Sequence, residues 1–447
     1  MPHMLIGFGR ADITPRIGVD LAGFGPFRNR RSIAVRDRLW ARAMAVSAGG
    51  RTVVVVSCDL IGVRLETARQ VRGLVQKAVG LPPEAVMVHC THTHSGPATR
   101  VLHGWGRTDQ PYLEILPHRI ARACVSAVED LREATLSYSE VPCEGIALNR
   151  EHDRDAPALD DVLCEDWRPA KPELTDTTCH VLRVDAGGEM LGFASRFGCH
   201  PVVCCEETRY IHGDFVGVAT NLLEREYPGA TGLFLQGAQG DINSCVCHKS
   251  ERESLLALDV IAARYANCVR RGLRLAGPVE VEEVRGVLRE VTFPRVGWSL
   301  DTLRAKLAEQ EALFAGPGAS DEDHDLRMAA VYAEALRLVI GRVAAGLPVE
   351  EPTELQGIRI GPISLLGTPF EVFRVVKNDI ESASVAKLPL LLGVTNDTLG
   401  YAPDRETAAR GGYAAEMVPL ITGSLPFDGV HDRLVEEALA VDGELQG

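Results

Sequence analysis

The chain has 447 residues, of which 46% are hydrophobic and 24% charged, a composition typical of ordinary globular proteins. No apolar run approaches the roughly 20 residues that a membrane-spanning helix needs, so a membrane span is not expected. The 61 acidic residues outnumber the 47 basic ones, giving a formal net charge of −14, and no Lys/Arg cluster is interleaved with aromatic residues. Such a surface repels phosphate backbones, so nucleic acid is not an expected partner.

The amino-terminal residues and the cysteines bear on the compartment. Residues 1–15 lack the basic region, apolar stretch and cleavage site of a secretory signal, so a cytoplasmic location is expected. The twelve cysteines show no disulfide-framework spacing, and several lie in apolar runs where a reduced cysteine packs as a small hydrophobic residue. Cys204, Cys205, Cys245 and Cys247 are soft-metal ligand types, but no second pair stands at zinc-finger spacing. We expect most cysteines in the core.

The first half of the chain alternates strands with a helix. Residues 40–47 and 52–58 are β-rich and are joined by a Gly-Gly turn. Residues 64–80 carry apolar side chains at helical spacing and stop at Gly80. Residues 85–92 form the next predicted strand, so strand, helix and strand make a βαβ unit. Its second strand ends on histidines, at the edge where open α/β sheets usually place their chemistry.

The second half repeats this arrangement and then changes character. Residues 218–229 predict a helix, 230–237 a strand, and 237–244 a glycine-bounded loop. The polar stretch 151–177 is expected to be a surface excursion, and 300–343 a pair of helices. We find no short-period repeat and no clean linker. The predicted fold class is therefore α/β with multilayer mixed sheets, in a single domain over residues 1–447.

Histidines cluster in two places. On a strand, His92 and His94 would point to one face, because they are two residues apart. A second cluster places His200 before a proline that constrains its backbone, followed by His212 and Asp214. Neutral imidazole is a common zinc ligand, and a catalytic zinc usually takes three protein ligands. The two clusters together predict a metal site, whereas His89 is expected to pack or cap.

Several short motifs occur in the order expected of one family. The motifs are GFGRADITP (7–15), LAGFG (21–25), DRLWARAMAV (37–46), CDL (58–60), THTHSGP (91–97), NRE (149–151), CHP (199–201), GDFVG (213–217), GAQGDIN (237–243) and NDTLGYAP (396–403). The most specific are ADITP near the amino terminus and THTHSGP around the first histidines. In these islands, over nearly the whole chain, the sequence resembles the neutral/alkaline, non-lysosomal ceramidases.

The resemblance implies a zinc-dependent amide hydrolase with an α/β catalytic domain. His92 and His200 resemble the zinc-binding histidines, and His94 the neighbouring catalytic histidine. Tyr401 resembles the tyrosine that approaches the zinc and helps to hold developing oxyanion charge. The resemblance thus implies one Zn2+ per chain. Zinc also suits His-rich ligation, whereas further carboxylates would favour iron or manganese.

The chain departs from the family pattern at two site positions. The family's Pro-Gly-Glu turn, which supplies a glutamate ligand, is replaced here by Gly-Thr-Pro-Phe-Glu, so Thr368 or Glu371 takes that place. We favour Glu371, because a hydroxyl is a poor zinc ligand. In the family's Gly-Asp-Val-Ser-Pro-Asn segment, Asn243 stands in the serine position. Unless Ser244 replaces that serine, a zinc-activated water is the expected nucleophile.

Candidates for proton transfer and oxyanion stabilisation follow from these positions. Asp241, Asp214 or Glu371 can take the proton, and Asn243 and Tyr401 are candidate oxyanion donors. Asp241 is equally suited to cap its loop through backbone hydrogen bonds. The candidate catalytic residues are therefore His94, Tyr401, Asp241 and Asn243, and the candidate metal ligands are His92, His200, Glu371 and Tyr401.

Three functions compete at this level. The first is amide cleavage of a small soluble molecule, favoured over a lipid because the family's additional β-sandwich domain and an export signal are not found in the sequence. The second is ester or lactone hydrolysis by the same zinc chemistry. The third is an inactive ligand-binding scaffold. Four arginines near the motifs are candidates for binding a substrate carboxylate, namely Arg100, Arg150, Arg196 and Arg209. No pattern in the chain sets its subunit number.

Overall fold

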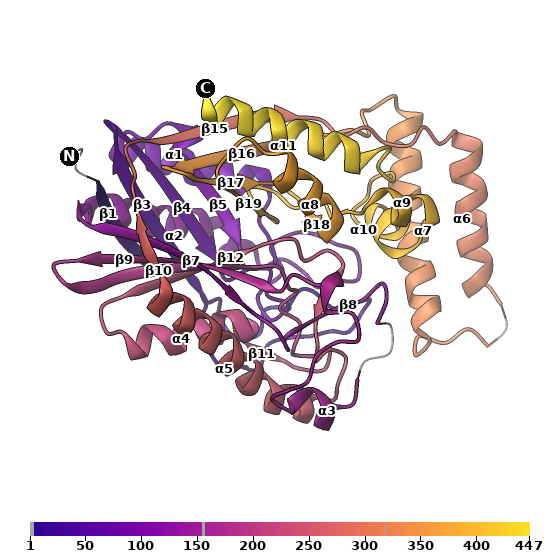
Figure 1. The fold of residues 1–447 in the computed structure, drawn as a ribbon. Coiled ribbons are helices and arrows are strands. Elements are labelled where there is room, and N and C mark those ends of the chain that lie inside the picture. Colours follow the sequence, from indigo (N-terminus) through magenta and orange to yellow (C-terminus); the bar gives the residue numbers. More distant parts are fainter. Residues whose placement is uncertain (1–3, 154–156, 317) are drawn as a thin grey trace.

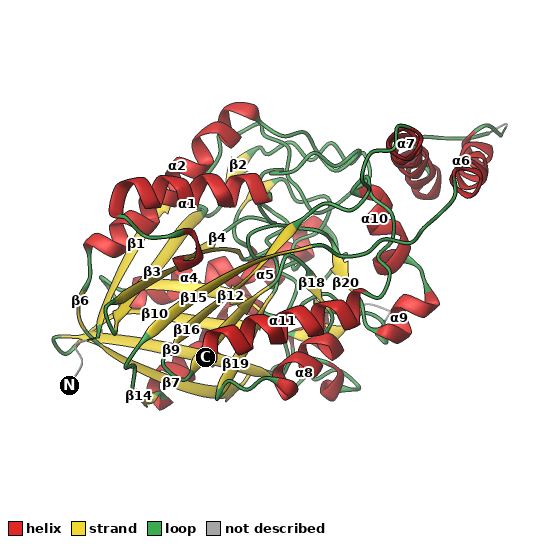
Figure 2. Cartoon of the chain, turned by 90° about the horizontal axis from the view of Figure 1, so that it is seen from above, coloured by secondary structure: helices red, strands yellow, loops and turns green. Residues whose placement is uncertain are grey.

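Three mixed sheets form the body of the protein, and their inner faces meet around one shared core (Figure 1). The computed structural model describes residues 4–153, 157–316 and 318–447. Each sheet carries helices on its outer face, as the view from above in Figure 2 makes clear. This arrangement confirms the predicted α/β class with mixed sheets.

The first sheet has five strands and is antiparallel except at one edge, where β4 and β5 run parallel. In spatial order it contains β5 (Val86–Cys90), β4 (Arg51–Cys58), β3 (Trp40–Ala48), β1 (Leu5–Asp12) and β6 (Arg132–Glu133). The two strands predicted around the Gly-Gly turn are confirmed as β3 and β4. Ala43 and Val56 face the outer helices, whereas Met44 and Val55 face the shared core, which is the alternation expected of a strand covered on both sides.

The second and third sheets also pair one parallel strand at an edge. The second contains β12 (Thr231–Gln236), β10 (Glu189–Phe197), β9 (Thr178–Ala186), β7 (Thr135–Pro142) and β14 (Gly277–Val279), with β10 and β12 parallel. The third contains β15 (Val284–Val291), β16 (Thr353–Ile360), β17 (Ile363–Gly367) and β19 (Leu388–Leu392), with β17 and β19 parallel. The parallel edge of each sheet is where the chemistry predicted from sequence gathers.

Helices cover the outer faces because each presents an apolar stripe to its sheet. The pairs are α1 (Leu65–Val79) with α2 (Gln110–Glu129) on the first sheet, α4 (Asp214–Glu226) with α5 (Glu251–Leu275) on the second, and α8 (Arg374–Ala383) with α11 (Val430–Gln446) on the third. The predicted end of α1 is confirmed, since Gly80 has φ 75° and donates its amide to Gln76 O. Left-handed backbone of this kind favours glycine.

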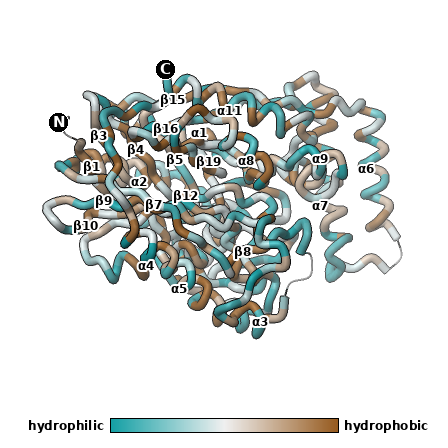
Figure 3. The backbone as a smooth tube through the Cα atoms, viewed as in Figure 1, coloured by the Kyte–Doolittle hydropathy of each residue, from teal (hydrophilic) through white to brown (hydrophobic). Residues whose placement is uncertain are grey.

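The predicted helical pair is confirmed as α6 (Leu300–Phe314) and α7 (His324–Ala344), which project from one end of the molecule (Figure 2). Hydrophobic and hydrophilic residues alternate along α6 in Figure 3. The two helices pack through a small apolar cluster that includes Leu303 and Leu336. They are therefore held to the body by less apolar contact than the sheet-covering helices.

Short elements complete the described chain. They are η1 (Pro83–Ala85), α3 (Leu159–Leu163), η2 (Pro172–Leu174), α9 (Arg405–Arg410), η3 (Tyr413–Met417), α10 (Val418–Ile421) and the two-stranded pairs β2 (Ala34–Val35) with β11 (Tyr210–Ile211), β8 (Ala147–Asn149) with β13 (Ile242–Ser244), and β18 (Glu371–Val372) with β20 (Tyr401–Ala402). The polar excursion predicted over 151–177 contains α3 and η2, and its residues 154–156 lie outside the described residues.

The cysteines lie largely in the core, as expected. All twelve are free thiols, and only Cys164 is exposed and Cys268 half-buried. Among the described residues, no helix combines the length and the apolar character needed to cross a membrane.

Candidate metal centre

The candidate centre lies where the parallel edges of the three sheets converge. His92 and His94 follow β5, His200 follows β10, and Glu371 lies four residues beyond β17. Each of these strands has a parallel neighbour in its own sheet. The carboxyl ends of three different strands therefore supply one shared site.

His92 and His200 are oriented in the same way. The Nδ1 of His92 lies 2.6 Å from Ile61 O, and the Nδ1 of His200 lies 3.1 Å from Ile242 O. A carbonyl oxygen only accepts hydrogen bonds, so Nδ1 carries the proton in both rings and Nε2 keeps its lone pair. Backbone carbonyls thus fix the tautomer that a metal ligand needs.

Glu371 faces both free nitrogens. Its Oε2 lies 2.9 Å from His200 Nε2 and 3.3 Å from His92 Nε2, and all three residues are buried. Burial alone would raise the pKa of Glu371, but the adjacent His92 and His200 rings hold that pKa well below its ordinary value. Burial lowers the pKa of His200 to about 4. The Glu371 carboxylate therefore keeps its negative charge at neutral pH, directly beside the two Nε2 atoms.

His94 completes the cluster. The three ring ligand atoms of His92, His94 and His200 lie within 4.8 Å of one another. His94 is half-buried, neither of its ring nitrogens has a hydrogen-bond partner, and burial lowers its pKa well below the ordinary value. A buried imidazole without partners is costly unless an ion or ligand satisfies it.

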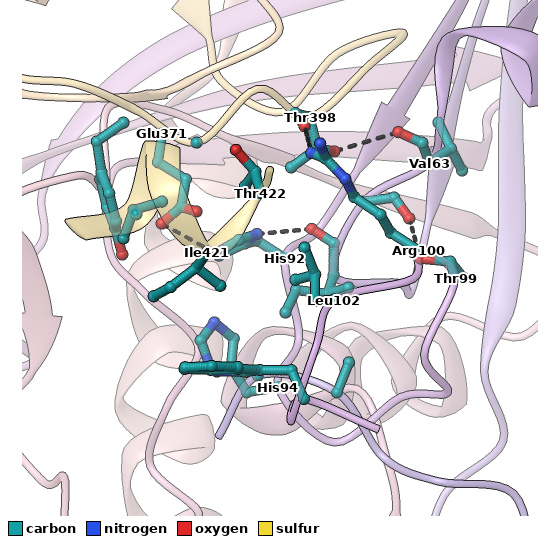
Figure 4. A pocket seen from close by; sticks show the side chains of 18 of the residues that line it. Val63, His92, His94, Thr99, Arg100, Leu102, Glu371, Thr398, Ile421 and Thr422 are labelled. Atoms are coloured by element: carbon teal, nitrogen blue, oxygen red, sulfur yellow. Dashed lines mark hydrogen bonds and ion pairs between the residues drawn. The ribbon is translucent and has the colours of Figure 1, made fainter. Parts of the chain in front are cut away.

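These groups fit a divalent metal ion. Nitrogen and oxygen ligands about 2.0–2.1 Å from a tetrahedral zinc ion are about 3.3 Å apart, which is close to the observed spacings. The ligand types are imidazole nitrogens and a carboxylate, all of which bind zinc. Figure 4 shows the Glu371 carboxylate directed at His92, with His94 beneath them. His92, His94, His200 and Glu371 form a candidate metal site.

The positions of His92 and His94 do not arise from strand geometry. The strand ends at Cys90, and His92 has a left-handed φ of 70°, so the rule that alternate strand residues share a face does not apply. The two rings nevertheless lie 4.9 Å apart. Histidine tolerates left-handed backbone better than branched residues do, and such strain is common at functional sites.

The expectation that His89 packs is confirmed by its contacts. It is fully buried, and its Nε2 accepts from Gln236 N at 2.7 Å. Its Nδ1 therefore donates to Thr395 Oγ1 at 3.0 Å, and Thr395 in turn donates to Gly393 O. Both ring nitrogens are used, so His89 joins two sheet edges and has no lone pair for a metal.

Tyr401 lies beside the centre, next to Arg150 and Tyr413. The β18–β20 pairing sets Tyr401 opposite Glu371, and Tyr401 lines the cavities next to the histidines. The guanidinium of Arg150 lies 4.8 Å from the Tyr401 ring and 6.0 Å from the Tyr413 ring. Burial raises the pKa of Tyr401 well above its ordinary value, so the hydroxyl keeps its proton.

Asn243 and Ser244 lie on adjacent positions of β13 and face different surroundings. Asn243 pairs through its backbone with His200 and lines the wider cavity beside the histidines. Ser244 is fully buried, and its hydroxyl accepts from Val246 N at 3.4 Å. Neighbouring strand residues point to opposite faces, so only one of the two can reach the cavity.

Asp241 is engaged in local hydrogen bonds. Its Oδ1 accepts from Arg374 N at 2.8 Å, and its Oδ2 accepts from Asn149 Nδ2 at 2.9 Å. It does not line the described cavities around the histidines. Thr368, the alternative to Glu371, donates its hydroxyl to Leu392 O at 3.1 Å.

Of the four candidate arginines, the structure brings two to the site. Arg150 and Arg100 line the two cavities that border the histidines. Arg196 is buried in ion pairs with Asp176 and Glu381, and Arg209 is exposed and donates to Arg31 O. Arg196 therefore has a partner already, and Arg209 lies on the surface.

Two residues near the centre had not been singled out from sequence. Arg30 is buried and donates to the carbonyls of Ala22, His94 and Thr208. Gly23, with φ 100°, lies so close to His94 that an added Cβ would be 2.4 Å from the ring. The LAGFG motif contains this glycine, but only the fold reveals what it touches.

A second cluster, Cys204, His212 and Asp214, has ligand types but different bonding. Its ligand atoms lie within 4.8 Å of one another. His212 Nδ1 accepts from Asp214 N at 3.1 Å, so its proton is on Nε2. The Asp214 carboxylate accepts from the amides of Val203, Cys204 and Phe215, which secures the turn into α4. These bonds occupy the lone pairs that an ion would need.

Comparison with known proteins agrees with this architecture. The family model for the N-terminal part of neutral/alkaline non-lysosomal ceramidases matches residues 4–270. The neutral ceramidase of Drosophila pseudoobscura pseudoobscura is 26% identical over 290 residues, covering 60% of this chain and 40% of that protein. The neutral ceramidase of Pseudomonas aeruginosa is 28% identical over 246 residues, covering 52% of this chain and 35% of that protein. The aligned part thus spans two fifths or less of these curated relatives.

Solved structures show the same fold over the whole chain. The crystal structure of neutral ceramidase from Pseudomonas aeruginosa matches with a TM-score of 0.72 at 18% identity, covering 100% of this chain and 75% of that one. A ceramidase complexed with C2 matches with a TM-score of 0.74 at 19% identity, covering 100% of this chain and 76% of that one. This chain belongs to the neutral/alkaline non-lysosomal ceramidase family.

Proposed function

We propose that this protein is a zinc-dependent hydrolase that cleaves the amide bond of a small molecule. The observation that carries the proposal is the convergence of His92 Nε2, His200 Nε2 and the Glu371 carboxylate, with Nδ1 of both rings bound to backbone carbonyls. Family membership supports the bond type, because ceramide is an N-acyl amide. Zinc fits the donor set, with His94 close enough to join it.

A zinc ion at these residues would lower the pKa of a bound water and polarise the substrate carbonyl. The chain supplies the remaining groups. Tyr401 keeps its phenolic proton and can donate a hydrogen bond to the oxygen on which negative charge develops. Arg150, against the Tyr401 ring, adds positive charge there, and Asn243 offers an amide donor from the cavity wall. In a centre held by His92, His200 and Glu371 alone, a neutral His94 can accept a proton and return it to the leaving amine.

The cavity favours a small acyl group. A space of about 110 Å³ opens on His92 and Glu371, and apolar residues such as Leu102, Trp105 and Ile421 contribute to its walls. A single water molecule needs about 10–15 Å³ of such cavity volume. The space therefore accommodates a short acyl group rather than a long lipid chain. A wider cavity of about 540 Å³, bordered partly by α6 and α7, adjoins it and leaves room for the amine portion.

Elemental analysis combined with hydrolysis assays tests the proposal. The wild type should carry a single zinc ion per chain, and a His92→Ala, His200→Ala double variant should lose it. His118→Ala, on the exposed side of α2, is the matched control and should keep the ion. Short N-acyl amides should be cleaved by the wild type, more slowly after chelation, and again at the original rate after zinc is returned.

Two results would contradict the proposal. A wild type that takes up no metal even from zinc-containing buffer would exclude the metal-dependent mechanism. If the zinc-loaded protein cleaves esters or lactones but no amide, the proposed bond type is wrong, while the proposed metal centre still stands.

A further inference from the structure

A small cleft of about 200 Å³ lies on the far side of Arg100 from the metal centre. Four arginines and one glutamate line it, in a protein whose formal net charge is −14. We call it the arginine cleft and define it by Arg64 before α1, Arg100 after the histidine loop, Arg295 after β15, and Arg342 near the end of α7. Its lining also includes the polar residues Thr422 and Ser424.

Arg100 has no carboxylate partner in the described part of the chain. Its guanidinium donates to Thr398 O, as Figure 4 shows, on the side of the cavity opposite Glu371. The nearby carboxylate of Asp397 is already bonded, to the amides of Leu65 and Thr398 and to the Thr353 hydroxyl. Burial lowers the pKa of Arg100, which means that its charge is poorly compensated where it lies.

Arg295 likewise has no carboxylate partner among the described residues. One Nη donates to Leu425 O at 2.8 Å, the guanidinium carbon lies 3.4 Å from the centre of the Phe427 ring, and the buried Nε has no hydrogen-bond partner. No described carboxylate lies within ion-pair distance of this guanidinium. Burial and the charge of Arg100 lower the pKa of Arg295 to about 9. Two half-buried cations therefore share one space.

The acidic groups around the cleft do not neutralise this pair. Glu351 is exposed and forms its ion pair with Arg342 at 2.8 Å. Glu350 accepts from the backbone amide of Arg295 rather than from its guanidinium. Arg64 is exposed and pairs with Glu66 at 3.1 Å. Arg100 and Arg295 are thus the two arginines of the cleft that form no ion pair with a described carboxylate.

We propose that the arginine cleft binds a tetrahedral oxyanion, a phosphate or a sulfate group. Guanidinium forks bind such groups through paired hydrogen bonds, and four of them line this cleft. The cleft, of about 200 Å³, has room for such a group. Arg100 and Thr422 also line the cavity that opens on His92 and Glu371, so the group is either a free anion or the charged end of a substrate.

Calorimetric titration with inorganic phosphate tests the site without any assay of hydrolysis. The wild type should bind phosphate, and Arg100→Gln and Arg295→Gln should each weaken the binding at least about tenfold. Arg274→Gln, at the exposed end of α5, is the matched control and should bind as the wild type does. The His92→Ala, His200→Ala variant should also bind phosphate, which separates the cleft from any anion held by a metal ion.

Thermal unfolding distinguishes a ligand site from a structural role. In phosphate-free buffer, Arg295→Gln should melt at or above the wild-type temperature, since it removes the repulsion between two like charges in the cleft. Added phosphate should raise the melting temperature of the wild type and not that of the variant. The proposal is overturned if the wild type does not bind phosphate, or if both cleft variants bind it undiminished.

Kinetics on cleavable amides then show whether the bound group is a free anion or the charged end of a substrate. If the anion belongs to the substrate, phosphate competes with anionic amides only, and Arg295→Gln raises KM for those alone. If it is a free ligand, phosphate changes the rate for neutral and anionic amides alike.

Discussion

At the scale of single residues, Gly23 and Gly18 offer a matched pair. Both have a left-handed φ, 100° and 95°. A Cβ at Gly23 would lie 2.4 Å from the His94 ring, whereas a Cβ at Gly18 meets nothing within 4 Å. Gly18→Ala should therefore lower the free energy of unfolding by about 1–2 kcal/mol from backbone strain alone. Gly23→Ala should cause the same backbone strain and should also displace His94, which should weaken zinc affinity about 10- to 100-fold.

Zinc affinity by competition with a chromophoric chelator, alongside chemical denaturation, measures both effects. If the two variants bind zinc equally well, His94 is not positioned by this contact.

The site residues also show what sequence can predict at this scale. His92, His200 and Glu371 were predicted as ligands because their chemical types and motifs carry the information. The carbonyls of Ile61 and Ile242, which fix the ring tautomers, have no sequence signal, because any residue type supplies a carbonyl. Their roles follow only from the fold.

At the scale of elements, Asp241 connects the start of α8 to the end of β8. Its two oxygens accept from Arg374 N and Asn149 Nδ2, so Asp241→Asn would place an amide donor against one of these donors. Losing one of these two hydrogen bonds should lower the free energy of unfolding by about 1–3 kcal/mol, with little change in kcat. Chemical denaturation and steady-state kinetics measure the two quantities. A fall of about 100-fold in kcat at unchanged stability would instead support the role of Asp241 as a general base.

Element prediction succeeded where the pattern is local. The β3–β4 hairpin, α1 and the α6–α7 pair were all expected from periodicity and glycine stops. The pair β18 and β20 was not, since each strand has two residues and exists only because distant loops meet. That pair sets Tyr401 beside Glu371, so local sequence patterns could not predict this part of the site.

At the scale of the whole molecule, buried neutral histidines shape the pH dependence of stability. Burial lowers the pKa of His89, His180 and His212 to about 3. Between pH 6.5 and 3 the unfolded chain binds protons there that the folded chain does not, so stability should fall as the pH falls. Asp214, whose pKa burial raises to about 6, acts in the opposite direction between about pH 4 and 6.

His180→Gln isolates one of these contributions. The Gln side-chain amide can still donate to the Tyr138 hydroxyl, which donates to Glu140 and lies 2.7 Å from His180 Nδ1. Below pH 6 the slope of unfolding free energy against pH should become less steep by about 1.4 kcal/mol per pH unit. Denaturant titrations at several pH values measure it, with His118→Gln on exposed α2 as the control. An unchanged slope would mean that His180 is protonated in the folded state.

The meeting of three sheets could not be read from sequence either. The strand–helix–strand order predicted the class, but the inner faces pack through residues as distant as Ile6 and Leu392. Alternating patterns indicate that a face is buried and do not identify its partner.

The origin of the proposed ligands in three separate sheets would also link binding of the proposed zinc ion to folding of the entire chain. His92, His200 and Glu371 come together only when all three sheets are docked, so an ion that binds them binds the folded state alone. Each tenfold excess of free ion over its dissociation constant then contributes about 1.4 kcal/mol of stability. Metal starvation would therefore lower the abundance of the protein as well as its activity, because unloaded chains unfold more readily and are removed by proteolysis.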